Sequence, residues 1–319
     1  MNRIAAVVAG LSLAFVGTSA SFADTINVPG DYPTIQGAIN ASSNGDVINI
    51  AAGTYNEHSL NPGGKAITIQ GTLNGDGSLA TTIDAEQGGR VFMINSQEDS
   101  GTVIQDLIIT GGGGASGAGI YCGYNSGPTI SGCTITGNEG SWYGGGINCS
   151  TNSSPTISGC TISENTARYG GGIHCYATYD TTIIGCTIIG NTATYGGGGI
   201  NSNDSNPTIS GCTIEGNSAD ILGGGIHCRY SNPNIIDSLI CGNAPDQIDG
   251  SYNDAGGNNV ADECPEESCA DLNNSGLIDI EDLLLLIGYW GTSDGDCDAD
   301  GDTDIEDLLY LIGSWGASC

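Results

Sequence analysis

A motif that recurs every 26 or 27 residues constrains the fold more than any other feature of this sequence. Its most regular form reads Pro-Thr-Ile-Ser-Gly-Cys-Thr-Ile, and an asparagine follows after two further residues. The motif cysteines are Cys133, Cys160, Cys186 and Cys212, and the asparagines are Asn138, Asn165, Asn191, Asn217 and Asn243. A second motif, Gly-Gly-Gly-Ile-x-Cys, ends at Cys122, Cys149, Cys175, Ser202 and Cys228. Helical repeats are excluded because no helix-forming run occurs between residues 46 and 262.

Short β-branched segments separated by glycine and asparagine predict a parallel β-solenoid. Each coil would consist of a few short strands, and equivalent residues of adjacent coils would stack about 4.8 Å apart. Isoleucine, valine and cysteine would form inward columns, while asparagine and glycine would occupy left-handed corners. A single coil cannot bury its inner face, so only the stack is stable.

The ends of such a stack need covers, because an open coil exposes unpaired strand edges. Residues 32–42 predict a helix that begins after Asp31 as N-cap and turns Ile35, Ala38 and Ile39 toward the first coil. Further strands are predicted at 47–50, 66–69, 81–83 and 91–94, and an irregular last coil at 245–260.

The stacked cysteines are predicted to be buried free thiols. Nine of the thirteen cysteines lie in or beside the repeats, and the others are Cys264, Cys269, Cys297 and Cys319. Disulfides within one coil would require both partners to be lost together, yet Ser202 shares a coil with Cys212. His174 and His227 directly precede motif cysteines, but alternation along a strand places them on the opposite face, which argues against a shared metal site.

The charge and the first residues indicate an exported protein. The 36 acidic and 5 basic residues give a net charge of −31, which argues against nucleic acid or an anionic membrane as partner. Residues 1–23 combine Arg3, an apolar run and a final Ser-Phe-Ala, the pattern of a signal peptide that is cleaved before Asp24. We expect a secreted protein, extracellular or at the cell surface, without a membrane span.

The last part of the chain contains a duplicated acidic loop with the ligand spacing of a calcium site. The copies begin their helices after Asp279 and Asp304, 25 residues apart. Oxygen ligands at alternate loop positions converge on one ion, so the spacing predicts two calcium ions. The predicted ligands are Asp271, Asn273, Ser275, the Leu277 carbonyl, Asp279 and Asp282 in the first loop, and Asp296, Asp298, Asp300, the Asp302 carbonyl, Asp304 and Asp307 in the second.

The repeat region resembles right-handed parallel β-helix proteins of the pectin lyase-like superfamily. The resemblance is carried by Val-Pro-Gly-Asp-Tyr-Pro-Thr-Ile-Gln-Gly-Ala-Ile at 28–39, Gly-Asp at 45–46 and Ala-Gly-Thr-Tyr at 52–55. The Gly-Gly-Gly-Ile and x-x-Asn pairs look like the repeats of polymorphic outer-membrane proteins. The resemblance implies an all-β domain over 24–262 with an N-terminal capping helix; it does not imply one function, because this fold carries lyases, hydrolases, esterases and non-catalytic proteins.

Residues 271–315, within a C-terminal module at 263–319, resemble the type I dockerin module of secreted polysaccharide-degrading systems. Position 12 of each loop is Asp rather than the Glu of ordinary EF-hands, and each loop is followed only by a helix. The resemblance implies a small α-helical calcium-loop module that binds a cohesin-like partner through positions 10 and 11 of each loop. These are Ile280, Glu281, Ile305 and Glu306. Dockerin helices often carry a basic residue, and this module has none.

Two classes of function follow for the solenoid. The first is binding or display of an extracellular surface or carbohydrate. The alternative is a pectate lyase-like enzyme or glycoside hydrolase of polysaccharide catabolism, which would need clustered carboxylates and a basic residue. Arg168 and Arg229 are the basic residues of the regular repeats, and neither aligns with acidic residues, so no catalytic residue is assigned. The recurrent Tyr143, Tyr169 and Tyr195, with Trp142, would pack as a turn column or stack on sugar rings.

Overall fold

The fold is taken from a computed structural model, which describes residues 23–114, 116–178, 180–264, 272, 278–291 and 303–313. Apart from Ala23, the predicted signal peptide lies outside these residues. The chain divides into two compact units between Glu263 and Cys264. Among the described helices, none combines the length and apolar character that crossing a membrane requires.

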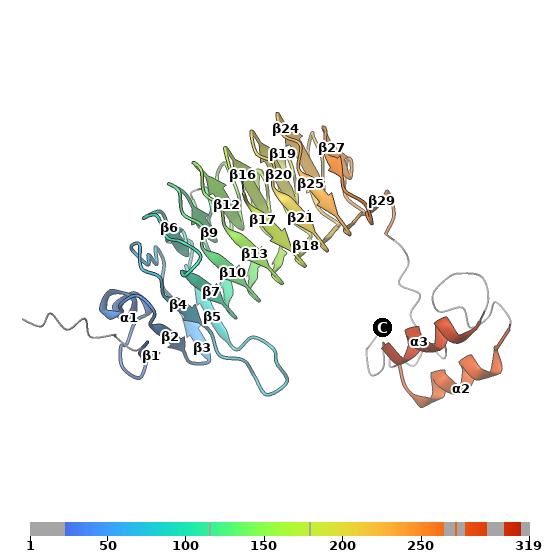
Figure 1. The fold of residues 1–319 in the computed structure, drawn as a ribbon, viewed down its shortest axis with the longest axis horizontal. Helices are drawn as coiled ribbons and strands as arrows, with labels where there is room; N and C mark the ends of the chain where they lie inside the picture. Colours follow the sequence, from blue (N-terminus) through green and yellow to red (C-terminus); the bar gives the residue numbers. More distant parts are fainter. Residues whose placement is uncertain are drawn as a thin grey trace, which may run out of the picture. The chain divides into compact units, whose positions relative to one another are not determined.

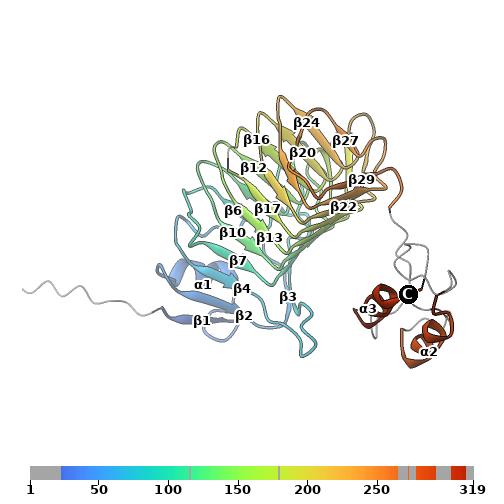
Figure 2. The same ribbon diagram turned by 45° about the vertical axis from the view of Figure 1, so that its right-hand side comes forward.

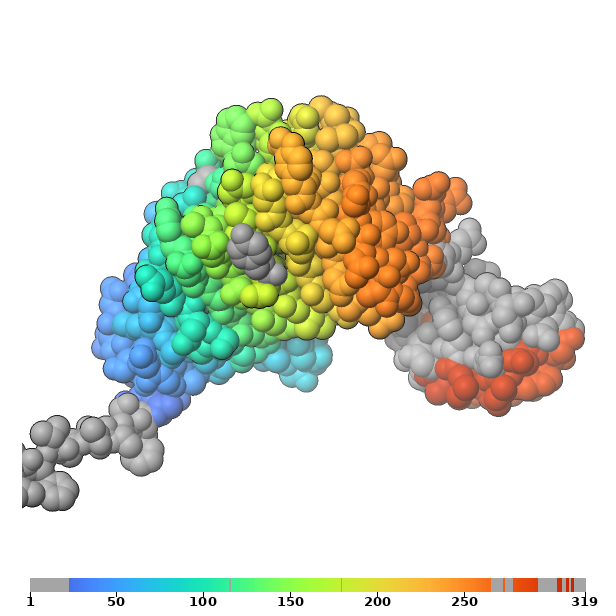
Figure 3. All heavy atoms as spheres, turned by 45° about the horizontal axis from the view of Figure 1, so that its top comes forward, coloured from blue at the N-terminus to red at the C-terminus, as the bar shows by residue number. Residues whose placement is uncertain are grey.

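The first unit is a parallel β-solenoid, as the repeats predict (Figure 1). Its coils contribute strands to three long sheets, which we name A, B and C, and to a small sheet D. Every pairing between the named strands is parallel, and the register joins equivalent repeat residues such as Ile130, Ile157 and Ile183. Figure 3 shows the coils following one another in the order of the sequence.

Sheet A contains β1 (Thr25–Val28), β2 (Val47–Ile50), β4 (Thr68–Gln70), β7 (Val103–Gln105), β10 (Thr129–Ser131), β13 (Thr156–Ser158), β17 (Thr182–Ile184), β21 (Thr208–Ser210), β25 (Asn234–Ile236) and β28 (Asn253–Asp254). Sheet B contains β3 (Gly53–Tyr55), β5 (Thr81–Asp84), β8 (Ile108–Thr110), β11 (Thr134–Thr136), β14 (Thr161–Ser163), β18 (Thr187–Ile189), β22 (Thr213–Glu215), β26 (Leu239–Cys241) and β29 (Asn259–Ala261). Sheet C contains β6 (Phe92–Ile94), β9 (Ile120–Cys122), β12 (Ile147–Ser150), β16 (Ile173–Tyr176), β20 (Ile200–Asn203), β24 (Ile226–Arg229) and β27 (Ile248–Asp249). Sheet D contains β15 (Thr166–Tyr169), β19 (Thr192–Gly196) and β23 (Ser218–Ala219).

The interior consists of stacked isoleucine and cysteine side chains, which form one continuous apolar cluster. The eight cysteines of the two repeat motifs are buried free thiols, as predicted. Cys241, which is not part of either column, is disulfide-bonded, and so is Cys264. Burial raises the pKa of the Cys228 thiol to about 12, so this side chain behaves as a small apolar group at neutral pH.

The repeated asparagines do not occupy left-handed corners, so that part of the prediction was wrong. The positive φ angles belong to the preceding residues, such as Gly137 and Gly190, both at 64°. The asparagines instead form a buried amide ladder, in which Asn165 donates from Nδ2 to Oδ1 of Asn191 over 3.0 Å. The amides bond backbone groups at the turn that follows each strand of sheet B, such as the carbonyl oxygen of Ile135, which accepts from Asn165 Nδ2.

The predicted capping helix is shorter than expected. α1 spans Ile35–Ala41 and covers the first coil with Ile35, Ala38 and Ile39, which are buried as predicted (Figure 2). Its N-cap is Thr34 rather than Asp31, and the Thr34 hydroxyl accepts a hydrogen bond from Gly37 N–H. Asp31 instead accepts from the backbone N–H of Asn27, which closes the turn after β1.

The second unit contains two helices, α2 (Ile280–Gly288) and α3 (Ile305–Gly313). Ile278, Leu286 and Leu311 form its small buried core. Gly291 N–H donates to the carbonyl oxygen of Thr303 over 2.7 Å, which joins the segments that flank the two helices. The two helices lie where the duplicated sequence places them.

Candidate functional site

The outward face of sheet C carries a continuous row of polar side chains. The strand register aligns Tyr121, Asn148, His174, Asn201, His227 and Asp249 on successive strands. Side chains alternate along a strand, so the residue that follows faces the interior: a cysteine after Tyr121, Asn148, His174 and His227, and Ser202 after Asn201. The four middle members, Asn148 to His227, are only 2–5% exposed although they face outward.

A column of tyrosines covers part of this row. Tyr169 and Tyr195 lie in β15 and β19 of sheet D, and Tyr143 pairs with Tyr169 through an isolated bridge. Their ring centroids lie 5.6 Å and 4.9 Å apart in sequence order. The Tyr143 ring also lies 4.6 Å from the imidazole of His174. The tyrosines therefore pack on one another as a column, and Tyr143 also packs against His174 of the polar row.

A groove of about 580 Å³ opens beside this column, a volume in the range of small-molecule sites. Its walls include the rings of Tyr121, Tyr143 and Tyr176. The other lining residues are Arg90, Ser116, Asn148, Ser150, Thr151, His174 and Asn203. A hollow of about 50 Å³ shares Tyr143, His174 and Asn203 with the groove. Its other lining residues are Tyr169, Asn201, His227 and Arg229.

Two hydrogen-bond acceptors in the groove have no partner within the described part of the chain. Asn148 Oδ1 lies 3.0 Å from His174 Nδ1. A carbonyl oxygen only accepts, so Nδ1 carries the proton and Nε2 keeps a lone pair. Both His174 Nε2 and Asn203 Oδ1 are buried and unpaired. Burial lowers the pKa of His174 to about 3, so the imidazole is neutral.

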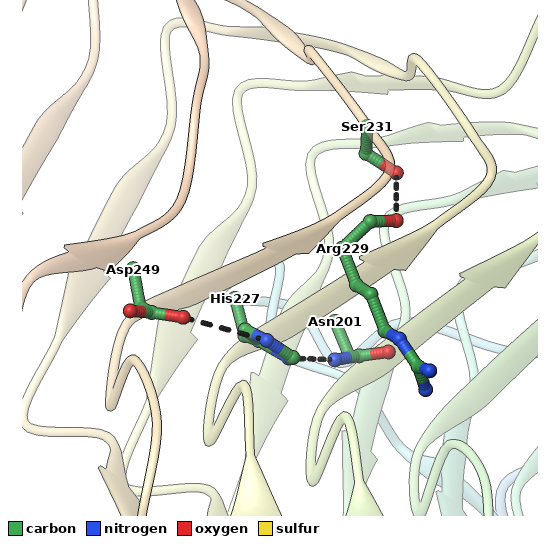
Figure 4. Close-up of polar contacts among 5 residues, drawn as sticks. All are labelled: Asn201, His227, Arg229, Ser231 and Asp249. Carbon is green, nitrogen blue, oxygen red and sulfur yellow. Dashed lines mark hydrogen bonds and ion pairs between the residues drawn. The ribbon is translucent and has the colours of Figure 1, made fainter.

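His227 differs from His174 because both of its ring nitrogens are engaged. Nδ1 lies 2.7 Å from Asn201 Nδ2, and Nε2 lies 3.4 Å from Asp249 Oδ2 (Figure 4). The amide donates to Nδ1, which places the proton on Nε2, facing the carboxylate. Burial lowers the pKa of His227, while the Asp249 carboxylate opposes that shift.

Three arginines of the solenoid stack on aromatic rings. Arg168 lies 4.8 Å from the Trp142 ring and 5.5 Å from the Tyr169 ring, so it belongs to the tyrosine column and not to the groove lining. The Arg90 guanidinium lies 4.6 Å above Tyr121 in the groove. Arg229 lines the smaller hollow and lies 5.3 Å from the Tyr230 ring.

Residues 43–201 match the protein family described as the right-handed β-helix region. The solenoid is a right-handed parallel β-helix. The structure of pectate lyase Pel9A is 15% identical over 75% of this chain and 68% of that chain, with a TM-score of 0.50. Pectin methylesterase PemA from Erwinia chrysanthemi is 11% identical over 74% of this chain and 82% of that one (TM-score 0.44). The pectin methylesterase from Aspergillus niger is 13% identical over 77% and 92%, respectively (TM-score 0.42). No curated protein sequence matches the chain significantly.

The β-helix unit contains a polar row that sequence reasoning missed. His174 and His227 were considered only as partners of the neighbouring cysteines. The available signal was the variable residue in Ile-x-Cys, which recurs at the 26- or 27-residue step and therefore lines up on one outward column. Tyr121 is the variable residue of the first Ile-x-Cys copy and carries the same signal, whereas Arg90 precedes the repeats and was missed for that reason.

The predicted calcium ligands are described only in part. Asp271, Asn273, Ser275, Leu277, Asp296, Asp298, Asp300 and Asp302 lie outside the described residues, as does the side chain of Asp307. Asp279 is the N-cap of α2, where its Oδ1 accepts from Glu281 N–H over 2.8 Å. The fully buried Asp282 accepts from Asp279 N–H over 2.8 Å. This capping box places two predicted ligand carboxylates together. Asp304 directly precedes α3 in the sequence.

Proposed function

We propose that the β-helix binds a polysaccharide in the groove of sheet C. The observation that carries this proposal is the combination of aromatic walls with two buried, unpaired hydrogen-bond acceptors, His174 Nε2 and Asn203 Oδ1. The apolar C–H faces of sugar rings pack against aromatic rings, and sugar hydroxyls supply donors to buried acceptors. Tyr143 and Tyr176 are 40% and 44% exposed, so both rings are accessible to a ligand.

Binding is favoured over catalysis by the chemistry of the lining. No aspartate or glutamate lines the groove or the smaller hollow among the described residues. His174 is a weak base because burial lowers its pKa to about 3, far from the value that suits a general base at neutral pH. His227 and Asp249 already contact each other, which favours a role in holding the polar row together.

The test measures binding of the chain from Asp24 onward to soluble neutral and uronic-acid polysaccharides by affinity electrophoresis and calorimetry. We expect Tyr176→Ala to weaken binding roughly 2- to 12-fold, the value of one aromatic contact. Tyr32→Ala is the matched control, because Tyr32 is 37% exposed and lies outside the groove. Unsaturated products or new reducing ends during incubation would instead support the alternative, a polysaccharide-degrading enzyme.

The second unit is proposed to be a dockerin-like module that binds two calcium ions and a cohesin-like protein. Carboxylate oxygens are the ligands that calcium prefers, and Asp279 and Asp282 lie together at the start of α2. Residues 264–319 contain no lysine, arginine or histidine, so bound cations would offset the charge of the loops. Of the predicted partner contacts, Ile280 and Ile305 are 56% and 55% exposed, and Glu281 is exposed.

Calcium binding is tested by calorimetric titration of the chelator-treated chain. The proposal expects two sites that are lost separately in Asp279→Ala and Asp304→Ala. A titration without heat or structural change would overturn it. Export, which the first 23 residues suggest, is tested by locating the full-length chain after expression in its own cell type and sequencing its N-terminus, with Asp24 expected first.

A further inference from the structure

We infer that the groove selects neutral, hydroxyl-bearing sugars, whose hydroxyl groups donate hydrogen bonds to His174 Nε2 and Asn203 Oδ1. The inference rests on the proposed polysaccharide binding and names its ligand class. His174 is only 2% exposed, yet it lines both the groove and the smaller hollow with an unpaired nitrogen. Asn203 lines the same two cavities from the neighbouring strand β20.

The hydrogen bond that His174 makes to Asn148 determines that a ligand must act as a hydrogen-bond donor toward Nε2. Because Asn148 Oδ1 accepts the Nδ1 proton, Nε2 presents a lone pair and no hydrogen. Asn203 Oδ1 likewise only accepts. A hydroxyl satisfies either atom by donating its proton. A carboxylate has no proton to donate at neutral pH, so it would leave both acceptors unpaired and place its charge against their lone pairs.

The two nearby arginines are packed on aromatic rings, and their positive charge is what an acidic sugar would use in place of the two acceptors. Arg90 Nε donates to the carbonyl oxygen of Ser116 over 2.7 Å, and its guanidinium lies over the Tyr121 ring. Arg229 lies over the Tyr230 ring. At the centre of the groove the ligand would meet Tyr143, Tyr176 and the two acceptors.

The number of protons taken up on ligand binding is an independent measure of which ligand class the imidazole of His174 contacts. Burial lowers the pKa of His174 to about 3, so a ligand that uses it as an acceptor requires no proton. A ligand carboxylate would instead recruit an imidazolium, and binding would take up a proton. The groups that face this imidazole are the Asn148 amide and the rings of Tyr143 and Tyr176, and none of them is a carboxylate.

The experiment is calorimetry at pH 6 in two buffers of different ionisation enthalpy, with the chain from Asp24 onward. The probes are soluble galactan, xylan and mannan as neutral polymers and polygalacturonate as the anionic one. The variants are His174→Phe, which keeps a ring against Tyr143, and Asn203→Leu, whose half-buried position makes it the safeguard if the first variant does not fold. Each is expected to bind a neutral polymer roughly 2- to 12-fold more weakly, without proton uptake by the wild type.

Three results would overturn the inference. These are tighter binding to polygalacturonate than to every neutral polymer, proton uptake with the ligand, and unchanged affinity in folded Asn203→Leu. In each of these cases the proposed binding function would stand. Absence of binding to all four polymers would refute the binding function itself and, with it, the inference.

Discussion

The buried amide ladder predicts that a single asparagine in it stabilises the solenoid strongly. Asn191 is fully buried, and its side chain makes five hydrogen bonds. Oδ1 accepts from the backbone N–H and from Nδ2 of Asn165, at 3.1 Å and 3.0 Å. Nδ2 donates to the carbonyl oxygens of Ile162 and Ile189 and to Oδ1 of Asn217. Asn191→Ala removes all five at once.

The expected cost follows from the groups that lose a partner. In this variant Asn165 Nδ2 still donates to the carbonyl oxygen of Ile135, and Asn217 Oδ1 still accepts from the N–H of residue 191. Each of these two groups therefore keeps one hydrogen-bond partner. The Asn165 N–H loses its acceptor, which costs about 1–3 kcal/mol for a buried donor. The remaining lost bonds contribute about 1 kcal/mol each at most. We expect destabilisation of about 3–5 kcal/mol.

The assay is urea unfolding of the chain from Asp24 onward, followed by far-ultraviolet circular dichroism. The matched control is Asn74→Ala in the exposed segment 73–78, where the side chain only donates to Ser78 Oγ. This control should change the stability by less than about 0.5 kcal/mol. Destabilisation by Asn191→Ala of the same size as the control would refute the reasoning, because solvent would then replace the ladder at no cost.

Three further predictions follow from the structure. The pKa of His174 is about 3 when folded and about 6.5 when unfolded, so its stabilising effect is present above pH 6.5 and is lost as the pH falls toward 3. Unfolding measurements at pH 7 and pH 5 should therefore differ by about 2 kcal/mol from this residue. Gly145→Ala should lower the melting temperature, because the added Cβ would lie 2.4 Å from the carbonyl oxygen of Thr166, whereas Gly75→Ala meets no atom within 4 Å. The eight stacked thiols should react with an aromatic disulfide reagent only after denaturation.

Each of these predictions has a result that contradicts it. For the pH dependence, the contradiction would be a His174→Phe variant with the same loss of stability between pH 7 and pH 5 as the wild type. For the glycines, it would be equal melting temperatures of the two alanine variants. For the thiols, it would be stoichiometric labelling of the native chain within minutes.

The coils and their core could be predicted because the repeat itself encodes them. A constant step aligns Ile130, Ile157 and Ile183 whatever the details of the turns, and the serine at position 202 of a cysteine column indicated unpaired thiols. The asparagine column was located correctly but misinterpreted. Asparagine is suited both to a left-handed corner and to a buried amide ladder, and only the direction of its side chain distinguishes them.

Features that depend on distant partners could not be predicted in the same way. Asp31 and Thr34 are both good N-caps, but the Glu57 carboxylate accepts from the N–H groups of Ile35 and Gln36, which fixes the start of α1. That contact joins residues more than 20 positions apart and leaves no local pattern. The groove is a similar case, because its walls come from five different coils and its free acceptors depend on which nitrogen of His174 is already bonded.

Alternating residues of a sheet C strand have different roles. The inward position is isoleucine in successive coils, as at Ile173, and packs in the core, whereas the outward position of His174 carries a different side chain in the neighbouring coils. One coil can therefore be inserted, removed or replaced as a unit. Inserting or deleting one 26-residue coil would lengthen or shorten the outward polar row of sheet C and leave the inner isoleucine and cysteine columns in register. The length and chemistry of this outward row can thus change while the core that stabilises the fold stays the same, both through unequal crossing-over of a repetitive gene and through protein engineering.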